Sequence, residues 1–174
     1  MNSSTNNIFL IGLMGVGKST VGKVLAKKLG RRFLDADHVI EERCGVKIPV
    51  IFEMEGEEGF RKREAQAIRK ITAEQGIILA TGGGAILLPE NRQALSEHGT
   101  VIYLHTNPIE LWLRTKGSEG RPLLKNGDAK KILEHLYAIR DPLYREIADH
   151  VIETGKPSVN QLVNTLIMQL ELSA

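Results

Sequence analysis

Hydrophobic residues occur along this chain in short continuous runs, and most runs are followed by a stretch with helical spacing. The apolar runs are predicted strands, at residues 8–11, 33–34, 77–80, 101–104 and 151–152. Strands that are apolar on both faces are typical of a parallel sheet with helices covering each side. The pattern predicts an α/β fold, and we interpret residues 1–174 as a single domain because no linker or repeat divides them.

Helical spacing is clearest near the C-terminus, where one apolar stripe comprises Val159, Leu162, Val163, Leu166, Ile167 and Leu170. An earlier helix is predicted to begin near Lys18 and to end before Gly30, a residue type that commonly terminates helices. A further helix is predicted to open at residue 60, with a buried face made of Phe60, Ala67, Ile68 and Ile71. Helices placed between the strands agree with the predicted fold class.

Residues 115–128 interrupt this regularity. The segment is rich in glycine and contains proline and serine, with few apolar residues. Such a composition suits a mobile lid, and an ordinary surface loop is the alternative. The presence of Arg121 in the segment favours the lid.

Composition excludes several classes of protein. The chain has 23 Lys and Arg against 21 Asp and Glu, and a net charge of +2 is too small to indicate nucleic acid as a partner. No apolar run approaches the roughly 20 residues that span a bilayer, and the first residues lack the features of a secretory signal. With Cys44 as the sole cysteine, no internal disulfide is possible. We therefore expect a cytoplasmic protein. We also expect a monomer, since nothing in the sequence suggests an obligate partner.

The segment Gly12–Ser19 (Gly-Leu-Met-Gly-Val-Gly-Lys-Ser) matches the pattern G-x-x-x-x-G-K-[ST] of phosphate-binding loops. A predicted strand precedes it and a predicted helix follows, as that loop requires. Glycines let backbone N–H groups turn inward, and the helix N-terminus adds positive potential. Lys18 would contact the β- and γ-phosphates, and the Ser19 hydroxyl could bind Mg²⁺. The alternative is a glycine turn that binds nothing, but pattern and context together favour phosphate.

Two carboxylates, Asp35 and Asp37, follow the predicted strand 33–34. In parallel sheets, ligands gather at the carboxyl ends of the strands. We interpret the two as having different roles, one assisting a metal and the other meeting an acceptor hydroxyl. N-capping of a helix that begins near His38 is the alternative, and it would explain one of the two carboxylates.

Two arginines occupy positions where a free charge would be costly. Arg61 lies beside the predicted buried face of its helix, with Glu64 three residues on and able to hold it. Arg140 extends an apolar helical face formed by Leu133, Leu136 and Tyr137, so it needs an anionic partner or a route to solvent. A bound anionic ligand and a structural ion pair with a protein carboxylate, such as Asp141 or Asp149, are both compatible with this spacing.

Three consecutive glycines, Gly82–Gly84, follow the predicted strand 77–80. They could form a tight exit from the strand, or they could let a ligand approach the backbone closely. Because they lie at the same edge of the sheet as the phosphate-binding loop, the ligand is favoured. The histidines show no metal-ligand spacing and are interpreted as structural or surface residues.

Taken in order along the chain, these features resemble the shikimate kinase family. The shared motifs are the phosphate-binding loop, the Asp-x-Asp at 35–37, and the segments 48–52, 56–61, 80–84, 121–124 and 140–144. The resemblance implies a nucleoside-monophosphate-kinase-like fold with three layers, a five-stranded parallel sheet in the order 2-3-1-4-5, and a lid. It also implies ATP-dependent phosphorylation of the shikimate 3-hydroxyl, with Mg²⁺.

On the acceptor side, the family motifs imply a binding segment at about 35–62. Asp37 would contact the ring hydroxyls and is the candidate base. Arg61 and Arg140 would bind the shikimate carboxylate, and the backbone of Gly82 and Gly83 would close the pocket.

On the nucleotide side, the same resemblance assigns ATP binding to Gly15, Val16, Gly17, Lys18, Ser19 and Thr20. Asp35 would support Mg²⁺ alongside Ser19. Arg121 would reach the phosphates from the lid, while Arg114 and Pro157 would border the adenine.

The sequence leaves two alternative functions open. One is a kinase for another small hydroxy acid, such as gluconate. The other is a nucleotide-dependent switch without catalysis, although a switch would not need the paired arginines or Asp37 for a second small molecule.

Overall fold

The computed structural model describes residues 6–115 and 128–173. These residues form one five-stranded sheet in the order β2-β3-β1-β4-β5, and all its neighbouring strands are parallel. The strands are β1 (Asn7–Ile11), β2 (Arg32–Asp35), β3 (Ile77–Ala80), β4 (Gly99–His105) and β5 (His150–Glu153). The predicted fold class and strand order are confirmed.

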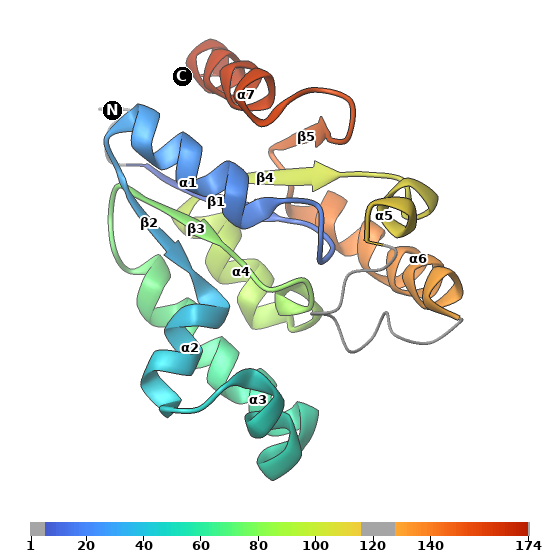
Figure 1. Ribbon diagram of the computed structural model, residues 1–174. Coiled ribbons are helices and arrows are strands. Elements are labelled where there is room, and N and C mark those ends of the chain that lie inside the picture. Colours follow the sequence, from blue (N-terminus) through green and yellow to red (C-terminus); the bar gives the residue numbers. More distant parts are fainter. Residues whose placement is uncertain (1–5, 116–127, 174) are drawn as a thin grey trace.

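Helices cover both faces of this sheet (Figure 1). On one side α1 packs against the first three strands and against α7, and on the other α4 packs against α3 and β4. The described helices are α1 (Lys18–Leu29), α2 (Ala36–Cys44), α3 (Ile48–Thr72), the short 3₁₀ helix η1 (Ala85–Leu87), α4 (Pro89–His98), α5 (Pro108–Thr115), α6 (Ala129–Ile147) and α7 (Val159–Ser173). The result is a three-layer arrangement.

The strands hold the centre of the core because their side chains are apolar on both faces. All five residues of β1 and all four of β3 are buried. Strand register aligns Asp35 with Ala80, Leu10 with Ala80, and Ile11 with Tyr103. The residues that follow β1, β2, β3 and β4 therefore meet at one edge of the sheet.

Most predicted boundaries agree with the structure, including the C-terminus of α1, where Gly30 has the left-handed φ of 65°. Some do not. The helix expected to open at residue 60 begins at Ile48, because α3 continues across a kink at Gly56, which has φ 72° and ψ −178°. The helix expected near His38 begins at Ala36, directly after β2. Val159, expected in the buried stripe of α7, is exposed.

The ion pair between Arg63 and Glu55 spans the kink in α3. The Arg63 Nε atom lies 3.0 and 3.1 Å from the two carboxylate oxygens of Glu55. The pair connects the two parts of α3 on the solvent side, since both side chains are partly exposed.

The predicted lid at residues 115–128 falls almost entirely outside the described residues. Thr115 ends α5, and Asp128 is the residue directly before α6. None of the described helices is both long enough and apolar enough to cross a membrane.

Gly22 in α1 supplies a test of the packing between helix and sheet. A Cβ atom at this position would collide with the ring of Phe33 and lie 3.2 Å from Leu10 Cδ1. We expect Gly22→Ala to lower the free energy of unfolding by about 1–3 kcal/mol, because an aromatic ring packed at the sheet must move. Urea denaturation measures this. Lys23→Ala, on the exposed side of the same helix, should change it by less than about 0.5 kcal/mol, and equal effects would contradict the packing argument.

Candidate active site

The phosphate-binding loop lies between β1 and α1, as predicted. Gly15 and Gly17 have φ values of 86° and 100°, a region that residues with side chains rarely adopt. The buried Lys18 Nζ atom donates to the carbonyls of Gly12 and Leu13, at 2.6 and 2.9 Å. The loop therefore holds an ammonium group at its own backbone, beside the N-terminus of α1.

Val16 and Thr20, which were also predicted to bind the nucleotide, differ in exposure. Val16 is buried in the core, so its contribution to the loop is through its backbone. Thr20 is exposed in the first turn of α1.

Asp35 connects the loop to the next strand and helix. Its Oδ2 atom accepts a hydrogen bond from the Ser19 hydroxyl at 2.5 Å, and its Oδ1 atom accepts from the backbone N–H groups of Asp37 and His38 at 3.0 and 3.3 Å. Asp35 is thus the N-cap of α2, which confirms the capping interpretation for one of the two carboxylates.

Ser19 and Asp35 also form a pair of oxygen atoms beside the phosphate-binding loop. Mg²⁺ prefers oxygen ligands, and in phosphate-transfer sites it uses one or two protein groups together with phosphate and water. Within residues 6–115 and 128–173, no group of three or more His, Cys, Asp or Glu could hold a metal. The Ser19–Asp35 pair fits Mg²⁺ that is bound together with a nucleotide.

Asp37 lies half-buried in the first turn of α2. Burial, followed by the charge of Asp35, raises the pKa of Asp37, while the positive charges of Lys18 and Arg61 oppose the rise. The result is a carboxylate with more affinity for a proton than an ordinary aspartate, within reach of the charges of Lys18 and Arg61.

The glycines after β3 each face a charged side chain. A Cβ atom on Gly82 would lie 2.9 Å from Asp37 Oδ1 and 3.1 Å from Glu64 Oε2. On Gly83 it would lie 3.3 Å from an Nη1 atom of Arg140, and on Gly84 it would collide with the Arg61 guanidinium. The three glycines let the backbone approach these charged groups, of which Asp37, Arg61 and Arg140 were predicted to bind the acceptor.

Glu64 forms an ion pair with Arg61, as its position three residues further along the chain indicated. The Glu64 side chain is buried, and its Oε1 atom lies 2.9 Å from Arg61 Nη1. Burial raises the pKa of Glu64, and the charge of Arg61 opposes that rise. Glu64 Oε2 and Arg61 Nε are buried and have no hydrogen-bond partner among the described residues. The pair retains polar atoms that could bind a ligand or water.

Arg140 is buried in α6, with 8% of its surface exposed. Neither of the carboxylates proposed as structural partners contacts it in the described part of the chain. Asp141 accepts hydrogen bonds from the Tyr103 hydroxyl and from Arg145, and Asp149 accepts from the backbone N–H of Val101. The structural ion pair with Asp141 or Asp149 is therefore wrong. Arg140 faces Gly83 instead, and its charge also acts on the buried Glu64.

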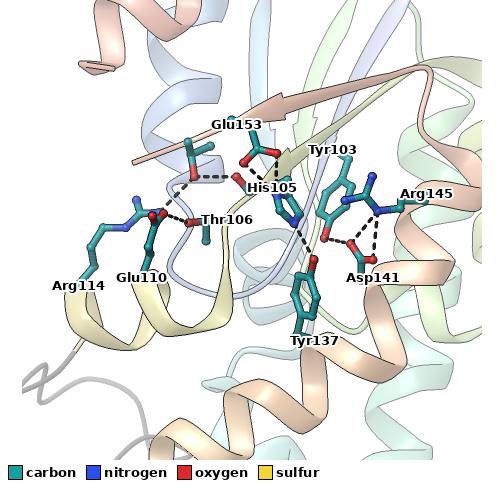
Figure 2. A network of polar contacts seen from close by, with 10 residues as sticks. Tyr103, His105, Thr106, Glu110, Arg114, Tyr137, Asp141, Arg145 and Glu153 are labelled. Carbon is teal, nitrogen blue, oxygen red and sulfur yellow. Dashed lines mark hydrogen bonds and ion pairs between the residues drawn. The ribbon is translucent and has the colours of Figure 1, made fainter. Parts of the chain in front are cut away.

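Arg114 lies at the end of α5, next to the loop that follows β5 (Figure 2). Its Nη2 atom donates to the Thr154 hydroxyl at 3.2 Å, and Thr154 in turn donates to the carbonyl of His105. The exposed Pro157 follows in the same loop, but the hydrogen bond that Arg114 makes to this loop within the described residues goes to Thr154. The structure therefore brings Arg114 to the loop of Pro157 rather than to Pro157 itself.

Comparison with known proteins gives one family. A family model described as shikimate kinase matches residues 14–171. A shikimate kinase from Cupriavidus pinatubonensis is 58% identical over 173 residues, which cover 99% of this chain and 90% of that protein. The chain belongs to the shikimate kinase family.

Solved structures agree with this membership of the shikimate kinase family. A shikimate kinase from Acinetobacter baumannii, solved in complex with shikimate, is 47% identical, with a TM-score of 0.91 and coverage of 98% of this chain and 95% of that one. A gluconokinase from Sinorhizobium meliloti has a TM-score of 0.66 at 17% identity, over 97% of this chain and 93% of that one, and shares the fold alone.

Sequence reasoning missed one residue of this shikimate kinase family site. Tyr144 is fully buried in α6, and its hydroxyl donates to the carbonyl of Gly83. It lies one helical turn after Arg140, so continuing the buried face of that helix would have indicated its position. Arg121, predicted to contact phosphates, lies outside the described residues.

The raised pKa of Asp37 predicts how this carboxyl affects stability. Because the folded-state pKa exceeds the unfolded one, the protonated acid favours folding, and that contribution is lost as pH rises through the folded-state pKa. At about pH 8 the charged carboxylate therefore destabilises the fold. We expect Asp37→Asn to raise the melting temperature there by roughly 2–4 °C, and the gain to shrink as the pH is lowered. Differential scanning fluorimetry measures both.

The matched control is Glu53→Gln, which changes an exposed carboxylate of α3. It should leave the melting temperature within about 1 °C. A melting temperature that falls in Asp37→Asn at the higher pH would contradict the assigned environment of Asp37.

Proposed function

We propose that this chain transfers the γ-phosphoryl group of ATP to the 3-hydroxyl of shikimate, giving shikimate 3-phosphate and ADP. The observation that supports this most directly is the set of contacts around Gly82–Gly84, the glycine turn. Gly82 and Gly83 lie against Asp37 and Arg140, and Gly83 also lies close to the phosphate-binding loop, since its Cβ would be 3.4 Å from the backbone N of Met14. A nucleotide site and a site for a hydroxylated anion thus share one wall.

On the nucleotide side, Lys18 and the backbone N–H groups of the loop neutralise the phosphates. The helix N-terminus at Lys18 adds to that positive potential. Ser19 and Asp35 would hold Mg²⁺, which when bound withdraws charge from the phosphate oxygens. The Ser19 oxygen would offer a lone pair to the metal, and its hydrogen could stay on Asp35.

On the acceptor side, Arg61 and Arg140 bind the carboxylate of shikimate by charge-assisted hydrogen bonds. Glu64 fixes the orientation of Arg61 through their contact of 2.9 Å. With the ring anchored, Asp37 meets the attacking hydroxyl, orients it, and accepts its proton as the oxygen bonds to phosphorus. The raised pKa of Asp37 makes it a better proton acceptor than an ordinary aspartate.

The remaining assignments follow from family motifs. Arg114 and the loop of Pro157 border the adenine, and Arg121 adds a cation at the phosphates. We also assign the protein to the cytoplasm, acting as a monomer.

A product assay tests the proposal directly. The purified chain is incubated with ATP, Mg²⁺ and each of shikimate, quinate and gluconate, and mass spectrometry detects the phosphorylated product. We expect the phosphoryl group on shikimate. Phosphorylation of gluconate in its place would favour the alternative kinase, and ATP hydrolysis without any phosphorylated product would favour a nucleotide-dependent switch.

Lys18 is the cation assigned to the phosphates, and its removal tests the nucleotide side. We expect Lys18→Ala to lower kcat by at least about 100-fold, since loss of one positioned charge at the transition state costs about 2.7 kcal/mol or more. Steady-state kinetics with shikimate measures this, and Lys23→Ala, on the exposed face of α1, is the control. Retention of more than about a tenth of the wild-type kcat would remove Lys18 from this role.

Arg61 and Arg63 form a matched pair for the acceptor side. Both lie on α3, but Arg61 faces Gly84 and Glu64, whereas Arg63 is exposed and pairs with Glu55. We expect Arg61→Ala to raise the KM for shikimate by at least about 30-fold, which corresponds to about 2 kcal/mol. Arg63→Ala should leave it within about twofold. Equal KM values for the two variants would place Arg61 outside the acceptor pocket.

A further inference from the structure

The glycine turn has no side chains of its own that could hydrogen-bond to its peptide groups. Its outer carbonyls are held by the chain that follows, because Gly82 accepts from the N–H of Ala85 and Gly84 accepts from the N–H of Leu87, each at 3.1 Å. The middle carbonyl, of Gly83, has no such backbone donor in the described chain. Its donor is the hydroxyl of Tyr144, 61 positions away in the sequence.

Tyr144 is itself held rigidly. The residue is fully buried in α6, and its ring packs against that of Tyr103 with 4.8 Å between centroids. Burial raises the pKa of the Tyr144 hydroxyl above its usual range, while the charge of Arg140 and a side-chain hydrogen bond with Arg140 oppose the rise. The hydroxyl therefore stays protonated at physiological pH and acts as a donor.

Arg140 and Tyr144 reach the same glycine from the same face of one helix. They are separated by one helical turn, and both point at Gly83, Arg140 with an Nη1 atom 3.3 Å from the position of an added Cβ. A carbonyl without a donor at this place would be a competing acceptor for the guanidinium. The Tyr144 hydroxyl donates to that carbonyl and also contacts Arg140, so it holds both groups and leaves the other N–H groups of the guanidinium for an incoming anion.

From this geometry we propose that Tyr144 is a positioning residue for recognition of the acceptor's carboxylate. Its hydroxyl fixes the Gly83–Gly84 peptide, which keeps the Gly83 carbonyl away from Arg140 and keeps the glycine turn in the shape that admits the anion. The inference depends on the proposed function, because it assigns a carboxylate to Arg140. It adds a residue whose role is to prepare the site rather than to contact the substrate.

Tyr144→Phe tests this, because it removes the hydroxyl and keeps the ring. We expect the KM for shikimate to rise about tenfold, equivalent to about 1.4 kcal/mol, while the KM for ATP stays within about twofold and kcat within about threefold. Tyr137→Phe is the control. It removes a hydroxyl from the same helix, but one that contacts His105 Nε2 at 2.7 Å and not the glycine turn, so it should leave the KM for shikimate unchanged.

A substrate analogue separates positioning from a general loss of packing. In the analogue, a hydroxymethyl group replaces the carboxylate of shikimate, so the contact that Tyr144 prepares is absent. The wild-type preference for shikimate over the analogue, as a ratio of kcat/KM values, should fall about tenfold in Tyr144→Phe. A preference that does not change, or an equal rise in both KM values, would overturn the proposal.

Folding of the variant is checked by circular dichroism. If Tyr144→Phe melts below the assay temperature, calorimetric titration of shikimate in the cold replaces the kinetic measurement, with the same tenfold loss of affinity expected. Failure of the proposed function is recognised separately, because the wild-type chain would then form no shikimate 3-phosphate. An active wild-type enzyme with unaltered carboxylate preference in the variant would refute only the role of Tyr144.

Discussion

The close approach of charged side chains to the backbone of Gly82–Gly84 is the constraint on which the site depends. Asp37 and Glu64 face the first glycine, Arg140 faces the second and Arg61 the third, so any side chain in this turn would displace one of them. Two acids and two guanidiniums gathered in partly buried surroundings would be unfavourable if their charges were not opposed. The glycine turn lets them compensate one another while their remaining polar atoms stay available.

This arrangement also places one short segment against both proposed substrate sites. Gly83 lies beside Gly12 and Met14 of the phosphate-binding loop, because β1 and β3 are neighbours in the sheet with Leu10 paired to Ala80. The strand order 2-3-1-4-5 places the acidic end of β2 next to β3 on its other side. Neighbouring strands thus bring phosphate-binding, acceptor-binding and acidic groups to one edge of the sheet, although they are far apart in the sequence.

Features set by short stretches of sequence were predictable, and those set by packing over long range were not. The phosphate-binding loop, the buried strands and the contact between Arg61 and Glu64 each depend on residues close together in the chain. The start of α3 was missed because Gly56 and Gly59 interrupt its apolar spacing. The sequence did not determine the partner of Arg140. The face that α6 presents to the glycine turn depends on how that helix packs against η1 and β4.

Asp35 caps α2 and also contacts Ser19 of the phosphate-binding loop. One of its oxygens caps the helix that begins with Ala36, while the other receives the Ser19 hydroxyl. A change in the hydrogen bonding of Ser19 when the nucleotide arrives would therefore be felt in the first turn of α2, where Asp37 lies. Occupancy of the nucleotide side would then alter affinity on the acceptor side, and by thermodynamic reciprocity the reverse would hold equally. Any coupling that runs through these hydrogen bonds would depend on a single aspartate.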